Sequence, residues 1–405
     1  MKIRAITAFS TLISPTDTQT IARAAEFLHT AQHQFEENGF EVQTLRLALP
    51  PLTEALSEVS PTAMTAFGQW LEKETQRHGI EYVSAGSIIA DTATADISAI
   101  TAVPELIAAT EAVFTSAVVA STQHGINLAA IHACADAVCR IGAQSADGFG
   151  NLRFAMLANV PADTPFFPGA YHHGSTPAFA IATEAADLAV TAFKNADSLA
   201  VAQQSLAKAI ARTGEKLASI ADTLAEAHGF SFGGIDFSPA PFPQPEISIG
   251  AAIEHLGVTT FGGHGSLFAT AFLTRILKEA NPRPTGYNGV MFPVLEDPIL
   301  AQRATEGEFG VNDLLLYSAV CGTGLDTIPI PGDSTIDQIA GVMLDVATLS
   351  VVLNKPLTAR LLPVPGLSAG DATTFNFEFF ANSAVLPLKG ASAPNIFRNN
   401  RFWEG

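Results

Sequence analysis

Polar side chains that could carry chemistry stand in short segments of the sequence, most of them beside glycines or at the end of an apolar run. They comprise two histidines, three carboxylates, a thiol and a basic pair. The residues are His172, Asp236, His264, Glu296, Asp297, Cys321, Lys355 and Arg360. Histidine transfers protons near neutral pH, carboxylates hold divalent cations or act as bases, and a thiolate is a nucleophile. Acid–base, metal-assisted and nucleophilic chemistry are therefore the classes to consider.

The carboxylates follow glycine-rich or apolar runs. Asp236 comes directly after Gly233-Gly234-Ile235, and Glu296 and Asp297 end the apolar run that begins at Val290. Ligand sites of parallel α/β proteins lie at the carboxyl ends of strands, so we expect these carboxylates to hold a divalent cation or to supply a base. The alternative is structural, with Asp236 serving a turn and Asp297 capping a helix start.

A glycine-rich segment containing His264 precedes a predicted helix over residues 266–280. Free N–H groups at a helix start can bind an anion, which makes Gly263, Gly265 and Ser266 candidates for substrate binding and His264 a candidate acid or base. The segment lacks the Gly-Lys-Ser/Thr of a phosphate-binding loop and the spacing of a dinucleotide fingerprint. The alternative is a tight turn with Ser266 as the helix N-cap.

His172 and Cys321 are the remaining catalytic candidates. His172 follows a proline- and aromatic-rich stretch, and a rigid loop of this kind can present a side chain to a ligand. Cys321 precedes a Gly-Thr-Gly turn, where a thiol of lowered pKa would be a nucleophile or a radical relay. The alternatives are packing for His172 and a buried, inert thiol for Cys321.

Lys355 precedes an otherwise neutral predicted strand over residues 357–364, and Arg360 lies within it. In a chain with 39 acidic and 21 basic residues, and so a formal charge of −18, such a pair is a candidate clamp for an anionic substrate. The same charge balance argues against nucleic acid as a partner, because phosphate backbones need clustered lysine and arginine.

The composition indicates a folded cytoplasmic protein. Hydrophobic residues make up 48% and charged residues 15% of the chain, which is not the balance of a disordered protein. No uninterrupted apolar run of about 20 residues predicts a membrane span. Three cysteines do not form a disulfide framework and fit a reducing compartment.

Strands alternate with helices along the chain, which predicts βα units and a largely parallel α/β arrangement. No linker separates the segments, so residues 1–405 are expected to form one compact domain, with residues 394–405 as a flexible tail. Helices are expected at 20–38, 62–78, 102–114, 178–227 (broken near 195–197), 247–256, 266–280 and 336–354, and strands at 4–13, 40–47, 80–89, 116–120 and 357–364.

Taken together, the segments resemble the "domain of unknown function 711" family, which is described as pyruvate-formate-lyase-like. The resemblance extends from residue 149 to residue 366 and includes the start KIRAIT. The matching segments are FGNLRFAMLANV, TPFFPGAYH, FSFGGIDFSPAP, FGGHGSLFATAFLT, VMFPVLED, LLLYSAVCGTGLDTIPIPGD and LNKPLTARLLPVPG.

This resemblance implies a ten-stranded α/β barrel of two half-barrels with added helices, as in glycyl-radical enzymes. Cys321 would then be the counterpart of the cysteine that such enzymes carry on a loop inside the barrel. The resemblance also implies a homodimer. The segment 395–405 (NIFRNNRFWEG) lacks the Arg-Val-x-Gly-aromatic motif that a glycyl radical requires, so the sequence argues against that chemistry.

We therefore expect a cytosolic enzyme that acts on a small anionic metabolite in a barrel pocket, by acid–base or metal-assisted chemistry and without its own glycyl radical. The sequence does not identify its cofactor, for which a divalent cation is the candidate. The alternative is a non-catalytic binding or regulatory protein on an inherited enzyme fold.

Overall fold

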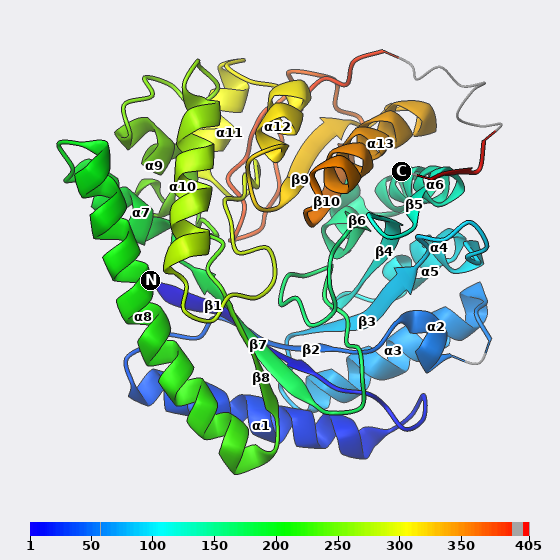
Figure 1. Ribbon diagram of the computed structural model, residues 1–405. Helices are drawn as coiled ribbons and strands as arrows, with labels where there is room; N and C mark the ends of the chain where they lie inside the picture. The colour runs from blue at the N-terminus through cyan, green and yellow to red at the C-terminus, as the bar shows by residue number, and fades with distance from the viewer. Residues whose placement is uncertain (57, 391–399, 405) are drawn as a thin grey trace.

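The computed structural model describes residues 1–56, 58–390 and 400–404, and its strands and helices alternate along the chain (Figure 1). The strands are β1 (Lys2–Phe9), β2 (Leu45–Ala48), β3 (Tyr82–Ile89), β4 (Val113–Ser121), β5 (Gly125–Asn127), β6 (Phe154–Ala158), β7 (Ala178–Glu184), β8 (Ser231–Asp236), β9 (Gly324–Pro331), β10 (Leu357–Val364) and β11 (Phe402–Trp403).

The helices differ widely in length, and two short 3₁₀ segments, Ala146–Arg153 and Pro245–Ile247, accompany them. The α-helices are α1 (Thr18–Glu37), α2 (Leu52–Ala55), α3 (Pro61–Arg77), α4 (Ser98–Thr101), α5 (Val103–Ala108), α6 (Leu128–Gln144), α7 (Ala186–Lys194), α8 (Leu199–His228), α9 (Ile249–His255), α10 (Ser266–Ala280), α11 (Pro298–Thr305), α12 (Val311–Ser318) and α13 (Ile336–Leu353).

The strands form one curved sheet in the order β8-β7-β1-β2-β3-β4-β6-β10-β9, with β5 and β11 attached beside β4. Strands β1, β2, β3, β4 and β6 run parallel to one another. The direction reverses at β7, which pairs antiparallel with β1, and at β10, which pairs antiparallel with β6. The mixed α/β class predicted from the sequence is confirmed.

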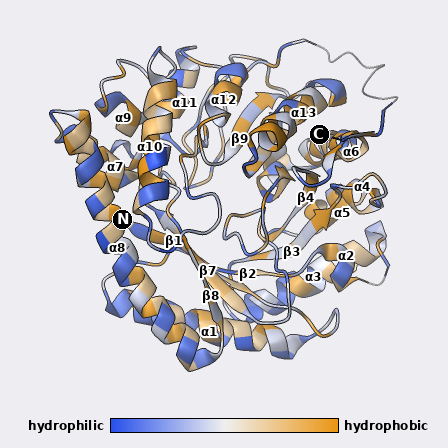
Figure 2. Cartoon of the chain, in the orientation of Figure 1, coloured by the Kyte–Doolittle hydropathy of each residue, from blue (hydrophilic) through white to orange (hydrophobic). Residues whose placement is uncertain are grey.

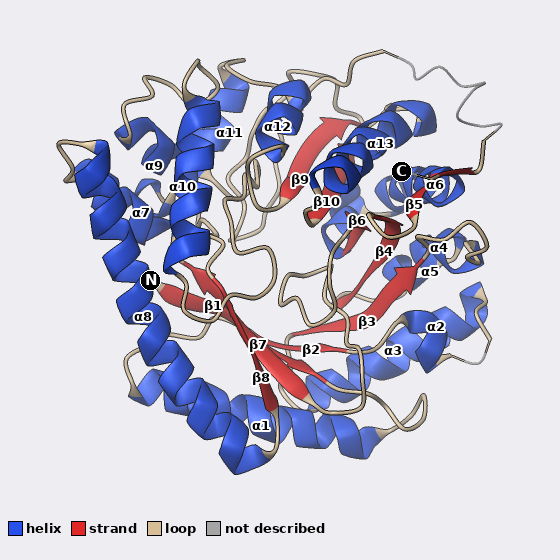
Figure 3. Cartoon of the chain, viewed as in Figure 1, coloured by secondary structure: helices blue, strands red, loops and turns tan. Residues whose placement is uncertain are grey.

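Helices surround the outer face of the sheet, and loops fill its inner side (Figure 3). Helices such as α1 and α8 carry hydrophobic and hydrophilic residues together (Figure 2). Their buried residues recur at three- and four-residue steps, for example Ile21, Ala24, Ala25 and Leu28 of α1. This periodicity places one apolar face against the sheet, and the main hydrophobic core forms there.

The inner face is separate from this core because successive side chains of a strand point to opposite faces. In β1, Ile6 and Ala8 join the core under the helices, whereas Phe9 packs inside with Phe114 and Phe167. The inner side chains thus come from different strands and from the loops that enter the curve of the sheet.

Strands β8 and β9 end the strand order and do not pair with each other. The segment 283–295 lies between them and makes isolated bridges to both, Ile235 with Pro284 and Pro293 with Asp326. The described strands therefore form an open sheet, and a closed ten-stranded barrel stays a prediction.

Two predicted helices are wrong over part of their length. Residues 178–184 form strand β7, since Phe179 and Ile181 face the outer core while Ala178 and Ala180 face inward. An alanine-rich composition hides this two-residue period. The predicted helix 102–114 is the short α5, which ends at Ala108, and β4 begins at Val113.

Among the described residues, α13 is the helix that is long and apolar enough to cross a membrane, judged by length and composition alone. Ile339, Met343 and Val346 of this helix are buried in the main core, so its sequence also fits a core helix. In the predicted tail, residues 394–399 and 405 lie outside the described residues. Phe402–Trp403 forms β11, which pairs with β5.

Asp297 holds two helix starts together, which confirms its interpretation as a cap. Its Oδ1 accepts hydrogen bonds from the N–H groups of Ile299 and Leu300 (both 3.0 Å) in α11 and from Ser248 Oγ (2.7 Å). Its Oδ2 accepts from the N–H of Ile249 at the start of α9 (2.6 Å). The side chain is fully buried, so these donors would have no water to replace it.

We predict that Asp297→Ala lowers the free energy of unfolding by about 2–4 kcal/mol, because it removes the cap of α11 and leaves buried donors unpaired at α9. Urea denaturation measures the change. Asp197→Ala, at an exposed position between α7 and α8, is the control and should change stability by less than about 0.5 kcal/mol. Equal effects of the two substitutions would contradict the capping role.

Candidate active site

A cavity of about 110 Å³ lies against the inner face of the sheet. A single water needs about 10–15 Å³ in this measure, so the cavity has room for a small organic molecule. Three arginines from three strands reach it, and we call it the arginine cavity. It is lined by Arg4, Gln43, Thr44, Arg46, Tyr82, Phe114, Leu152, Pro165, Phe166, Phe167, Ala182, Thr183, Asp236, Ser238, Ala240, Met291, Glu296, Asp326, Arg360, Phe377 and Phe379.

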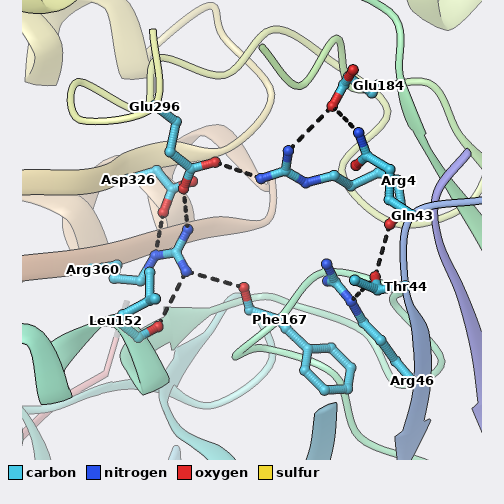
Figure 4. A network of polar contacts seen from close by, with 10 residues as sticks. All are labelled: Arg4, Gln43, Thr44, Arg46, Leu152, Phe167, Glu184, Glu296, Asp326 and Arg360. Carbon is cyan, nitrogen blue, oxygen red and sulfur yellow. Dashed lines mark hydrogen bonds and ion pairs between the residues drawn. The ribbon is translucent and has the colours of Figure 1, made fainter. Parts of the chain in front are cut away.

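A chain of buried ion pairs crosses one wall of this cavity (Figure 4). Glu296 lies at its centre, with Oε2 2.9 Å from Arg4 Nη2 and Oε1 3.3 Å from Arg360 Nη2. Arg360 also donates from Nε to Asp326 Oδ1 at 2.6 Å. Arg4 reaches Glu184 Oε2 from Nη1 at 3.4 Å. The network thereby joins β1, β7, β9, β10 and the loop before α11.

Burial disfavours the ionised forms of the side chains in this network, and the ion pairs favour them. Burial raises the pKa of Glu296, although Arg4 and Arg360 favour its ionised form. For Arg360, burial alone would lower the pKa, but Asp326 and Glu296 outweigh it and raise the pKa above its ordinary value. The Arg360 guanidinium is also fixed by the carbonyl oxygens of Leu152 (3.2 Å) and Phe167 (3.4 Å).

Arg46 differs from the other two arginines of the cavity. Its Nε donates to Thr44 Oγ1 at 2.9 Å, and its guanidinium carbon lies 5.7 Å from the ring centre of Tyr82 and 5.2 Å from that of Phe167. Within the described part of the chain, no carboxylate pairs with it and nothing accepts from Nη1 or Nη2. Burial, with repulsion from Arg4, lowers the pKa of Arg46 to about 10.

Asp236 lines the cavity but its oxygens are occupied by the backbone. Oδ1 accepts from the N–H groups of Ser238 (2.8 Å) and Asn288 (3.0 Å), and Oδ2 accepts from the N–H of Tyr287 (3.0 Å). A Cβ at Gly286 would stand 2.3 Å from Oδ2, and the φ of +64° at Gly286 also favours glycine. Asp236 therefore fixes the loop 286–288, in agreement with the turn alternative.

Residues 1–378 match the family described as "Uncharacterised ACR (DUF711)". The chain belongs to this family. Among its relatives, a UPF0210 protein of Pyrobaculum islandicum is 32% identical over 395 residues, which cover 92% of this chain and 87% of the relative. UPF0210 proteins of Oleidesulfovibrio alaskensis and Methanopyrus kandleri are each 29% identical, over 93% of this chain and 86% of the relative.

The family resemblance drawn from the sequence is thus confirmed, and three of the predicted site residues meet in this DUF711 protein. Glu296, Arg360 and Asp236 all line the arginine cavity. Asp297 does not, because it is turned into the junction of α9 and α11. Glu296 and Asp297 are adjacent in sequence and point into different surroundings.

The predicted anion site around His264 lies apart from the arginine cavity. His264 and Gly265 are exposed at the start of α10, and none of the residues 263–266 lines the cavity. Ser266 is the first residue of the helix and Gly265 is its N-cap, so the interpretation of Ser266 as the N-cap is wrong. The Ser266 hydroxyl instead accepts from the N–H of Gly262 at 3.1 Å.

Cys321 and Lys355 contact each other outside the cavity lining, next to the end of α12. Cys321 is fully buried, and its Sγ accepts from the N–H of Gly324 at 3.4 Å. Lys355 Nζ donates to the carbonyl oxygens of Cys321 and Ser318, the latter at 2.9 Å. Burial lowers the pKa of Lys355. In this position Lys355 satisfies carbonyls at the end of α12 and does not extend toward Arg360.

His172 is buried in a loop on the inner side and does not line the cavity. Its Nδ1 lies 2.8 Å from Asp163 Oδ1, and its Nε2 has no hydrogen-bond partner among the described residues. The Phe9 ring lies 6.3 Å away. Its predicted catalytic role stays a prediction.

The carboxylates predicted to hold a metal do not share a site, since Asp236 and Asp297 bind backbone N–H groups at separate places. In residues 1–56, 58–390 and 400–404, no group of three or more His, Cys, Asp or Glu side chains is arranged to hold a metal ion. We therefore assign no divalent cation to a set of donors among the described residues.

Sequence reasoning missed Arg4, Arg46 and Asp326. A signal for Arg46 exists in Thr44-Leu45-Arg46-Leu47, where polar and apolar residues alternate in a short strand. Leu45 and Leu47 belong to the outer core, which places Arg46 on the inner face. No local pattern predicts that Arg4, Asp326 and Glu296 meet, because only the curvature of the sheet brings them together.

We predict that Arg360→Met lowers the free energy of unfolding by about 3–5 kcal/mol, because it leaves the buried carboxylates of Asp326 and Glu296 short of a partner. Chemical denaturation measures this loss, and Arg275→Met on the exposed face of α10 is the matched control.

The double variant Arg360→Met with Asp326→Asn should recover part of the loss, since it removes one of the unpaired charges. Additive losses in the double variant would contradict direct coupling between Arg360 and Asp326.

Proposed function

We propose that this protein is an enzyme that acts on a small anionic molecule in the arginine cavity by acid–base chemistry. The observation that carries the proposal is the Arg46 guanidinium, which contributes to the lining with two nitrogens that no described residue engages. Arg46 is half-buried and lines the cavity, so a ligand in that space can reach these two nitrogens. A ligand anion would supply a partner for them.

The position of Arg46 suits a binding residue. Thr44 fixes its Nε, and the rings of Tyr82 and Phe167 lie against the guanidinium. This support limits the rotamers of a flexible side chain, so little freedom remains to be lost when a ligand binds. The lowered pKa of Arg46 agrees with an unfavourable charge that an anion would relieve.

Glu296 is the group that we assign to proton transfer. It lines the same cavity, it is 7% exposed, and burial raises its pKa. A nearby anion would raise that pKa further and favour the protonated form, which can donate to the bound molecule. Arg4 and Arg360 hold its two oxygens and would stabilise the carboxylate once the proton has left.

We also propose that the cavity lies in the interior of a barrel of the glycyl-radical type. The curved strand order supports this, as do the bridges of segment 283–295 to Ile235 and Asp326, one on each end strand. Cys321 comes just before β9, which supplies Asp326 to the cavity. A homodimer and a cytoplasmic location also stay proposals.

The alternative function is binding without turnover, on the same residues. Arg46 supports both functions equally, since it accounts for the anion and not for its conversion. Glu296 distinguishes the enzyme from the binding protein. In an enzyme, Glu296 transfers a proton during turnover, whereas in a binding protein it only pairs with Arg4 and Arg360.

The test incubates the protein with a small-molecule extract and follows the anionic species by mass spectrometry, with bound species recovered by ultrafiltration. We predict that the wild type consumes an anion, that Arg46→Gln neither binds nor consumes it, and that Glu296→Gln binds it but converts it at least about 100-fold more slowly. Arg23→Gln, which also lies over a phenyl ring (Phe230, 5.6 Å) but on the exposed face of α1, is the control.

Consumption by Glu296→Gln at the wild-type rate would contradict the assigned proton transfer. A species that the wild type binds through Arg46 and never converts would favour the non-catalytic alternative.

A further inference from the structure

We infer that the ligand of the arginine cavity is a small organic monocarboxylate with an apolar or aromatic body. This inference rests on the proposed anion binding by Arg46 and adds the chemical class of the anion. Three features carry it: the shape of the free edge of Arg46, the charge balance around it, and the aromatic lining.

The side of the Arg46 guanidinium that carries Nη1 and Nη2, which no described residue engages, suits a planar anion. Thr44 occupies Nε, while Tyr82 and Phe167 lie against the guanidinium, so the Nη1 and Nη2 side is what remains for a ligand. Two N–H groups in one plane match the two oxygens of a carboxylate in a bidentate pair. A tetrahedral phosphate would also find these two donors, but only two of its oxygens can lie in the guanidinium plane, so the other oxygens would have to turn to lining hydroxyl groups such as that of Tyr82.

The charge balance favours a single negative charge. Three arginines (Arg4, Arg46 and Arg360) stand with four carboxylates (Glu184, Asp236, Glu296 and Asp326), so the fully ionised cluster has a charge of 3 − 4 = −1. A dianion would stand against Glu296 and Asp326 with no excess positive charge to balance it. A monoanion adds one negative charge, which a single proton on the buried Glu296 carboxylate would offset, whereas a dianion would need two protons.

The remaining lining is mostly aromatic or aliphatic. The rings lie on different sides of the cavity, with Phe166 over Arg360 (5.4 Å) and Phe379 over Arg4 (5.0 Å). Burying a ligand's apolar surface against such walls contributes to affinity in proportion to area. The apolar contributors include Phe114, Leu152, Met291 and Phe377. A carboxylate with an apolar body would therefore bind more tightly than the carboxylate alone.

The experiment is isothermal titration of the full chain with three probes: 3-phenylpropanoate, acetate and inorganic phosphate. We expect 3-phenylpropanoate to bind roughly tenfold or more tightly than acetate, from burial of the ring, and more tightly than phosphate. Arg46→Gln should lose this binding, and Arg46→Lys should retain only part of it because lysine lacks the planar pair of donors. Arg23→Gln should bind like the wild type. Circular dichroism and melting temperatures establish that each variant is folded.

Two results would overturn the ligand class while leaving anion binding by Arg46 in place. Phosphate that binds more tightly than 3-phenylpropanoate, and still depends on Arg46, would overturn the monocarboxylate. Acetate that binds as tightly as 3-phenylpropanoate would overturn the apolar body. If folded wild-type protein binds none of the three probes, or binds them equally in Arg46→Gln, the inference fails together with the proposed function.

Discussion

The position of Glu296 between Arg4 and Arg360 is the interaction on which the interior of this protein depends. It joins the first strand of the chain to one of the last through a single carboxylate, and Asp326 and Glu184 extend the chain of ion pairs at its two ends. Charges withdrawn from water are tolerated only when they are paired and hydrogen-bonded. The curvature that brings β1, β7, β9 and β10 around one cavity places these charges within reach of one another, so that each buried charge of the network is paired.

Arg46 differs from Arg4 and Arg360 in that no carboxylate of the described residues pairs with it. Arg4 and Arg360 complete the network, whereas Arg46 is held by Thr44 and by aromatic rings and keeps two nitrogens unengaged by the described residues. One wall of the cavity is thus internally satisfied, and an adjacent residue still lacks an anion. The same geometry places Glu296, a carboxylate whose pKa is raised by burial, beside the space that the anion would occupy. Binding and proton transfer would then depend on a shared set of charges.

The sequence predicts the class of fold well and the site only in part. Helical periodicity locates α10 and α13, because amphipathic spacing is a local property. Glu296 and Arg360 are identified as site residues from their position at the ends of apolar runs and in a neutral strand. Lys355 and His264 were predicted as site residues from similar local patterns, but they lie outside the arginine cavity. Their distance from it depends on how the loops pack, which the local sequence does not show. Arg46 was missed because an isolated arginine in a short strand gains its significance only from the residues that surround it after folding.

A crystal structure of the protein with 4-bromobenzoate, whose bromine gives an anomalous signal, tests carboxylate binding by Arg46 directly. If Arg46 binds the carboxylate, a bromine peak appears inside the arginine cavity, among the aromatic side chains, with the carboxylate oxygens at hydrogen-bond distance from Nη1 and Nη2 of Arg46. A cavity that stays empty while Arg46 remains unengaged, or a bromobenzoate whose carboxylate binds only at another place such as the α10 start near His264, would contradict that binding.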